Sequence, residues 1–74
     1  MDGLTEGRIV HYVTDEGRHL ASIVVKVWSK EYGTVNLCVF NDFAHDMEGD
    51  TQRQTSVNYS EEPTPNTWHW IEKA

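Results

Sequence analysis

The residues best suited to chemistry gather in two short segments, TWHW near the C-terminus and GRIVHY near the N-terminus. An indole face stacks on any nucleobase, worth roughly 1–3 kcal/mol per base. Trp68 and Trp70 could therefore form a stacking platform, with His69 donating to a phosphate or a base edge. Arg8 adds a planar, forked donor that suits phosphate or carboxylate groups. These residue types favour a site for a small nucleotide-like ligand.

The two segments become neighbours if the last strand of a small sheet closes beside the first. The predicted ligand site then comprises Arg8, His11, Tyr12, Trp68, His69 and Trp70. A purely structural alternative exists for each of them. One aromatic pair could pack on the barrel with His69 facing outward, while Arg8 could form a salt bridge on a sheet face. His11 shares a strand face with Ile9 and Val13, so a buried, hydrogen-bonded histidine is an equal alternative.

Other chemistry finds less support in the sequence. Cys38 is the only cysteine, which excludes an intramolecular disulfide, and nothing beside it supplies a base. The four histidines do not have a zinc-ligand spacing with it. Four acids, Asp42, Asp46, Glu48 and Asp50, resemble a calcium loop in composition but lack its spacing. No catalytic motif stands out, so we expect a non-enzymatic protein without a cofactor.

Charge narrows the choice of partners. Twelve acidic residues face six basic ones, which gives a formal net charge of -6. An acidic chain is a poor binder of double-stranded nucleic acid, which attracts basic surfaces. A few local donors could still hold a small anion, and the acidic surface could alternatively mimic DNA. The N-terminus lacks an apolar run and no stretch is long enough to span a membrane, so we expect an intracellular protein with no membrane partner.

The sequence predicts that the candidate site residues are positioned by short strands separated by turns. We predict strands at Gly7–Thr14, His19–Ser29, Thr34–Asn41, Thr55–Ser60 and Thr67–Glu72. Turns are predicted at DEGR and KEYG, a polar acidic loop at Asp42–Gln54, and a rigid connection at EEPTPN, where two prolines exclude a helix and a central strand. No segment shows a sustained helical repeat.

This pattern predicts one all-β domain over residues 1–74, a five-stranded, partly open SH3-like barrel, with an OB-like barrel as the alternative. At period two, apolar side chains share one face of each central strand. The predicted core is Ala21, Ile23, Val25, Val27, Val35, Leu37 and Val39. A chain this short buries little surface. Because it has no disulfide or metal motif and a partly open barrel has free edges, we expect a homo-oligomer.

GRIVHY together with TWHW resembles a set of small bacteriophage and prophage proteins, many of which continue as W-H-W-P where this chain has Ile71. The resemblance implies a viral origin and thus a location in the host cell cytoplasm. A phage gains from capturing a nucleotide-type immune signal of its host, so we expect a counter-defence protein that sequesters such a signal. The alternatives are an acidic inhibitor or adaptor of a host or phage protein, and a minor virion or assembly component.

Overall fold

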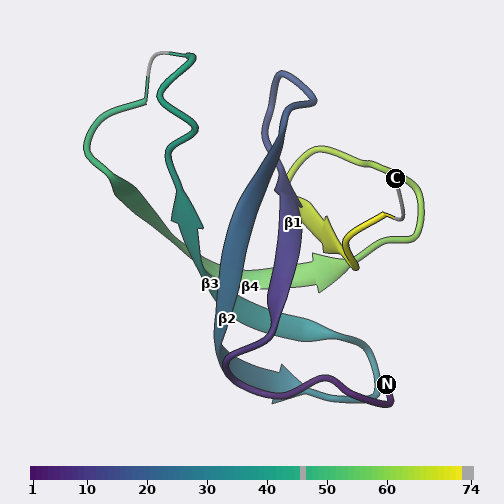
Figure 1. The fold of residues 1–74 in the computed structure, drawn as a ribbon. Coiled ribbons are helices and arrows are strands. Elements are labelled where there is room, and N and C mark those ends of the chain that lie inside the picture. Colours follow the sequence, from purple (N-terminus) through teal and green to yellow (C-terminus); the bar gives the residue numbers. More distant parts are fainter. Residues whose placement is uncertain (46, 73–74) are drawn as a thin grey trace.

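Five strands follow one another around a closed barrel in the computed structural model, which describes residues 1–45 and 47–72 (Figure 1). Their bounds are β1 Ile9–Val13, β2 His19–Ser29, β3 Thr34–Phe40, β4 Thr51–Tyr59 and β5 Thr67–His69. Each strand pairs with the next along the chain. The all-β prediction is confirmed, and the sheet closes on itself where a partly open barrel was expected.

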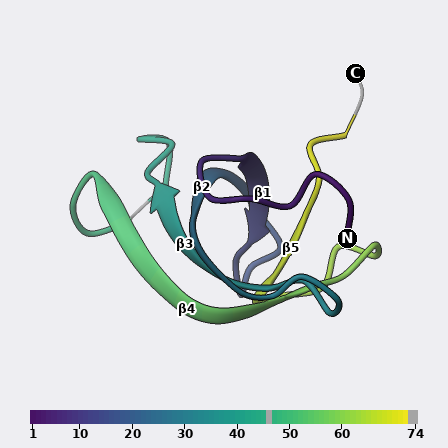
Figure 2. The ribbon, with the colours of Figure 1, turned by 90° about the horizontal axis from the view of Figure 1, so that it is seen from below.

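The short strand β5 closes the barrel. It pairs antiparallel with β1, through His11 opposite His69 and Tyr12 opposite Trp68. On its other side it pairs in parallel with β4. In the view from below, β4 curves beneath the other strands and β5 lies between the end of β4 and β1 (Figure 2). The aromatic segment near the C-terminus is therefore fixed between two strands, as predicted.

The prediction of the inner face of β2 is wrong for three residues. Leu20, Ser22 and Val24 are buried, while Ala21 and Val25 are exposed and Ile23 is partly exposed. Both faces of this strand are rich in apolar residues, so alternation alone could not choose between them. A bulge after Val24 then changes the alternation.

The rest of the predicted core agrees better with the structure. Beyond the bulge, Val27 lies opposite Val35 and packs against the core. Val35, Leu37 and Val39 are buried as predicted. The inner face of β3 could be predicted from the sequence because all three inward positions are aliphatic, whereas Thr34 and Asn36 on the outward face are polar.

Two strand boundaries also differ from the prediction. β4 begins at Thr51, although a polar loop was expected up to Gln54. Its first residues, TQRQ, are exposed or partly exposed and have no apolar alternation, so their pairing with β3 left no signal in the pattern. β5 ends at His69, so the chain leaves the sheet before Glu72. Asp46, one of the predicted acidic-loop residues, lies outside the described residues.

Trp68 is the largest fully buried side chain of the core. Its indole N–H donates a hydrogen bond of 2.7 Å to the carbonyl oxygen of Gly33, and its ring packs edge-on against Tyr59 and Trp70. Gly33 has a φ of +74°, and a Cβ there would come within 2.7 Å of side-chain atoms of Met1 and Tyr59. The turn between β2 and β3 therefore requires glycine at this position.

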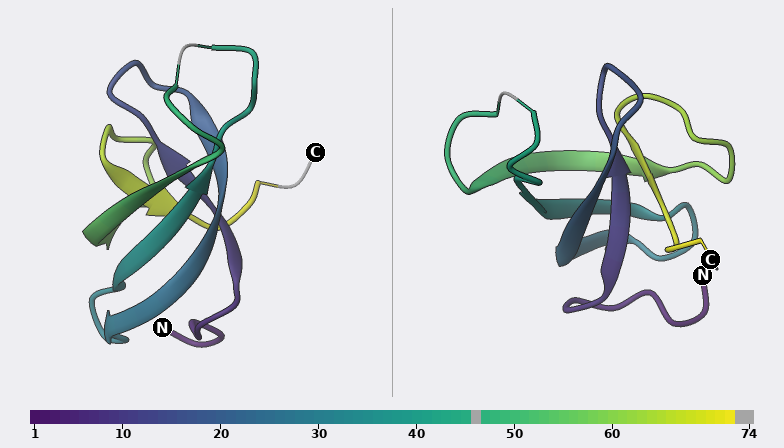
Figure 3. Two further views of the ribbon diagram at one scale, coloured as in Figure 1. Left: turned by 90° about the vertical axis from the view of Figure 1, so that its left-hand side faces the viewer. Right: turned by 45° about the horizontal axis from the view of Figure 1, so that its top comes forward.

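The two ends of the barrel are covered differently. At one end, the N-terminal segment buries Leu4 completely and joins the sheet through a hydrogen bond from the Gly7 amide to Val24. At the other end, the β1–β2 loop and residues 41–45 and 47–50 project side by side (Figure 3). Within residues 1–45 and 47–72, no helix has the length and apolar character needed to cross a membrane.

Candidate metal-binding site

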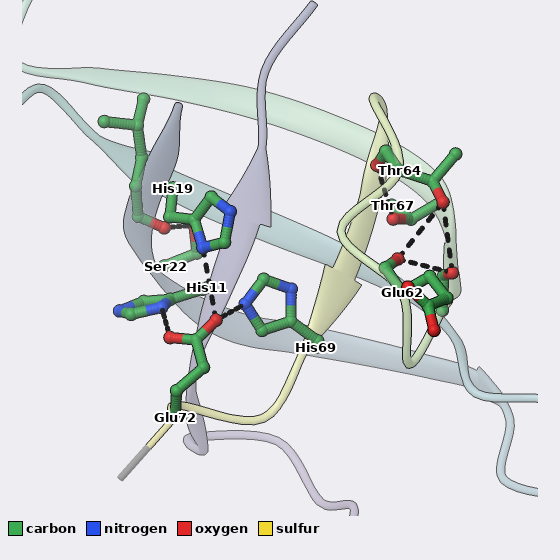
Figure 4. A network of polar contacts seen from close by, with 10 residues as sticks. His11, His19, Ser22, Glu62, Thr64, Thr67, His69 and Glu72 are labelled. Atoms are coloured by element: carbon green, nitrogen blue, oxygen red, sulfur yellow. Dashed lines mark hydrogen bonds and ion pairs between the residues drawn. The ribbon is translucent and has the colours of Figure 1, made fainter. Parts of the chain in front are cut away.

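Three histidines lie together on the outer face of the barrel, one from each of three adjacent strands. His11 of β1 lies directly opposite His69 of β5. His19 of β2 pairs with Val13, two residues beyond His11, so its side chain points to the same face. The pairing of the strands therefore brings the three rings together (Figure 4).

The imidazole rings are in edge-to-face contact. Their centroids are 5.9 Å apart between His11 and His19, 5.6 Å between His11 and His69, and 4.7 Å between His19 and His69. The side chain of His69 is only 6% exposed, whereas the other two rings are partly exposed. The cluster thus has one buried ring and two rings that face solvent.

The carboxylate of Glu72 lies among the three rings. His11 Nδ1 is 2.9 Å from its Oε2 and His19 Nδ1 is 3.1 Å from its Oε1, while His69 Nε2 forms an ion-pair contact with the same Oε1 (Figure 4). One ligand atom from each of these four residues lies within 4.8 Å of all the others. We call His11, His19, His69 and Glu72 the three-histidine site.

The electrostatic environment keeps Glu72 ionised. Its pKa falls from the ordinary 4.5 to about 2. The largest cause is a hydrogen bond from its own backbone amide, and the charge of His69 and the close polar contacts with His11 and His69 contribute further, while burial opposes the shift. At neutral pH the group is therefore a carboxylate that can act as a metal ligand.

One nitrogen of the buried His69 ring, Nδ1, has no polar partner among the described residues. Both ring nitrogens are inaccessible to solvent and neither makes a hydrogen bond with residues 1–45 or 47–72; Nε2 has only its ion-pair contact with Glu72. A buried polar group without a hydrogen bond costs about 1–3 kcal/mol and is rare in native proteins. Nε2 faces the centre of the site, where a metal ion would take the place of its contact with Glu72.

Three imidazoles and one carboxylate form a donor set that suits Zn²⁺. Zinc takes four ligands in a tetrahedron, with bonds of about 2.0–2.2 Å to nitrogen and oxygen. Such bonds place the donor atoms about 3.3 Å from one another. The present separations reach up to 4.8 Å, so small rotations of the exposed rings and of Glu72 would complete the geometry.

The structure places the six predicted site residues in different environments. His11 and His69 come together as expected. Tyr12 and Trp68 also lie opposite each other, but both point into the barrel: Tyr12 is 3% exposed and Trp68 is fully buried. Trp68 therefore presents no face on which a base could stack, and the hydroxyl of Tyr12 donates to Asn66 instead.

The other two predicted residues make different contacts. Arg8 donates through Nε to the carbonyl of Gly3, at 2.8 Å. Trp70 is partly buried against Trp68 at the edge of the core. The predicted aromatic platform therefore does not form in this structure.

His19 and Glu72 are the two site residues that the sequence reasoning missed. A signal for His19 existed: in a hairpin with the short turn DEGR, His19 and His11 fall on the same sheet face. Glu72 gave no comparable signal, because it was assigned to a strand that in fact ends at His69. Its position depends on how the chain bends after β5.

The fourth histidine lies elsewhere. His45 pairs with Asp42 at 3.0 Å in the segment that follows β3. It lines a cavity of about 320 Å³ at that end of the barrel, together with residues that include Asp15, Glu16 and Arg18. His45 is therefore a natural control for experiments on the three-histidine site.

No protein family, curated protein or solved structure was found to match this chain.

Proposed function

We propose that this protein is a binding module for a divalent transition-metal ion of the Zn²⁺ class, held by the three-histidine site. The observation that carries the proposal is the convergence of His11, His19 and His69 on the carboxylate of Glu72. Imidazole nitrogens favour zinc, copper, nickel and iron, whereas calcium and magnesium prefer sites made of oxygen ligands.

The charge of the protein supports a cationic ligand. A formal net charge of -6 attracts cations to the surface and counted against the nucleotide predicted from TWHW. The same charge therefore favours metal capture over capture of a free anion by the apoprotein.

The size of the domain gives a metal a structural purpose as well. Small domains usually need a disulfide, a metal or a partner subunit for stability, and a disulfide within this chain is impossible. An ion bound to the histidines of β1, β2 and β5 and to Glu72 would hold together the strands where β5 closes the barrel against β1. A bound ion would reduce the need for stabilisation by self-association. The homo-oligomer prediction also relied on free sheet edges, and the closed sheet has none among the described strands.

The proposal is tested by titrating the metal-free protein with ZnCl₂ in a calorimeter. One ion per chain should bind. His19→Ala should weaken binding roughly 100-fold or more, since even residues that only support a metal ligand are worth about 10–100-fold. His45→Ala should bind zinc like the unmodified protein. Absence of binding, or equal losses in the two variants, would refute the proposal.

Nucleotide sequestration in an infected host cell is the second candidate function. The feature that favours it is the way three imidazoles already surround an anionic group. A phosphate could occupy the same position, although the buried Trp68 cannot provide the expected stacking. Titration of the metal-free protein with AMP and with cyclic nucleotides tests this candidate, and no binding by any of them would exclude it for the apoprotein. The bacteriophage origin and the cytoplasmic location stay predictions.

A further inference from the structure

We infer that Glu72 is an exchangeable ligand, and that a metal at the three-histidine site binds an external oxyanion, a carboxylate or phosphate group, in its place. This inference rests on the proposed metal binding and adds a ligand class to it. In this arrangement the three histidines hold the metal, and Glu72 occupies one coordination position that an external ligand can take.

The four ligands differ in how firmly the fold holds them. His11, His19 and His69 all lie within paired strands, so the sheet fixes their backbone positions. Glu72 lies beyond the end of β5, and its side chain is 50% exposed. Of these four residues, Glu72 is therefore the one whose backbone can move away while the barrel stays paired.

The contacts of Glu72 show that the space among the three rings accommodates a carboxylate. Its two carboxylate oxygens are shared among the three rings, Oε2 with His11 and Oε1 with His19 and His69. A free carboxylate or phosphate presents the same arrangement of adjacent oxygens. Zinc sites with three protein ligands keep their fourth position for water or substrate, so a three-histidine metal would accept such an oxygen ligand.

The surroundings of the site also suit an anion with an organic part. β1, β2 and β5 contain no aspartate or glutamate, so the wall behind the histidines lacks the acids that give the whole protein its negative charge. Next to the site, Ile9 lies opposite Ile23 on the outer face and is 57% exposed. Ala21 lies opposite His11 and leaves space beside the ring. An apolar group attached to the oxyanion would find contacts there.

Glu72 competes with any external ligand because it is tethered. A short flexible tether gives an effective concentration in the millimolar range. An external oxyanion must overcome this competitor in the unmodified protein. Removal of the carboxylate should therefore reveal the open position.

The experiment uses Zn²⁺-loaded protein and compares Glu72→Ala and Glu72→Gln with the unmodified chain. The matched control is Glu62→Ala, which removes an exposed acid whose carboxylate makes no contact with the site. Zinc affinity is measured first for each protein. Sodium acetate, inorganic phosphate and AMP are then titrated separately by calorimetry, with and without zinc.

At least one of these oxyanions should bind the zinc-loaded Glu72 variants about tenfold more tightly than the unmodified or Glu62→Ala protein, because the tethered competitor is gone. Preference for acetate would identify a carboxylate ligand, and preference for phosphate or AMP a phosphate ligand. If zinc binds but none of the three anions gains affinity in the Glu72 variants, the exchange is refuted while metal binding stands. Equal anion binding with and without zinc would also refute the exchange of Glu72 for an external ligand. If none of the proteins binds zinc, the proposed function itself fails.

Discussion

Substituting Trp68 by Phe tests the inward orientation of β5, on which the position of His69 depends. The side chain is fully buried, and its N–H donates to the carbonyl of Gly33 at 2.7 Å. Phenylalanine keeps an aromatic ring but cannot make this bond. The variant therefore removes one hydrogen bond and a small volume from the core while retaining most of its apolar contacts.

The expected loss can be worked out from these two changes. Leaving the Gly33 carbonyl buried without a partner costs about 1–3 kcal/mol. The smaller ring leaves ~40 Å³, which at ~24 cal/mol per Å³ adds about 1 kcal/mol. The sum is about 2–4 kcal/mol, against a total stability of roughly 4–11 kcal/mol for a chain of this length. The variant should stay folded at low temperature and melt at least about 8 °C lower.

Urea denaturation followed by far-ultraviolet circular dichroism measures this loss, because tryptophan fluorescence would change with the substitution itself. Trp70→Phe is the control. Trp70 is only partly buried and makes no hydrogen bond through its side chain to a described residue, so it should lose less than about 1.5 kcal/mol. If both variants lose the same amount, or if the Trp68 variant is as stable as the parent, Trp68 does not anchor β5 in the way described.

Three further predictions address the core and its ionisable groups. Val24→Asp should unfold the protein and Val25→Asp should not, since Val24 is fully buried and Val25 is 53% exposed; soluble yield and circular dichroism distinguish them. Gly33→Ala should cost more than about 2 kcal/mol in urea denaturation, because it combines a positive φ with steric overlap. Burial, and to a lesser extent the charge of Asp15, raises the pKa of Tyr12 in the folded protein above the ordinary value of 10.0. The protonated hydroxyl therefore contributes its full stability below pH 10.0, and this contribution is lost as the pH rises through the higher folded pKa. Thermal melts between about pH 8 and pH 11 should show a smaller alkaline loss for Tyr12→Phe than for the parent.

The order of the strands could be predicted because turn residues mark most of their connections. DEGR, KEYG and EEPTPN each separate two extended segments, and β2 has the predicted bounds. The inner face of β2 could not be predicted, because its central residues are apolar on both sides and the bulge after Val24 depends on the partner strand. The polar start of β4 depends in the same way on pairing with β3.

The candidate site was predictable only where it follows from strand closure. The expectation that TWHW closes beside GRIVHY correctly brings His11 next to His69. Two details of the backbone determine the positions of the other two site residues, His19 and Glu72. The register of the β1–β2 hairpin places His19 on the same face, and the bend after His69 returns Glu72 to the rings. The short turn DEGR gives a signal for the hairpin register, whereas the residue types give none for the bend after His69. Trp68, which suggested a stacking site, is buried inside the barrel.

The pairing of β1 with β5 has a consequence for how fast the barrel opens and closes. His11 and Glu72 are 61 residues apart in the chain, so the contacts around them require closure of nearly the longest loop available. Contacts of such high sequence separation pay a large entropy cost and tend to form late in folding. Interactions absent from the transition state slow unfolding and leave the folding rate almost unchanged. An ion bound across this seam would therefore prolong the lifetime of the native barrel, protecting it from proteases that cleave only after opening, without helping a newly made chain to fold.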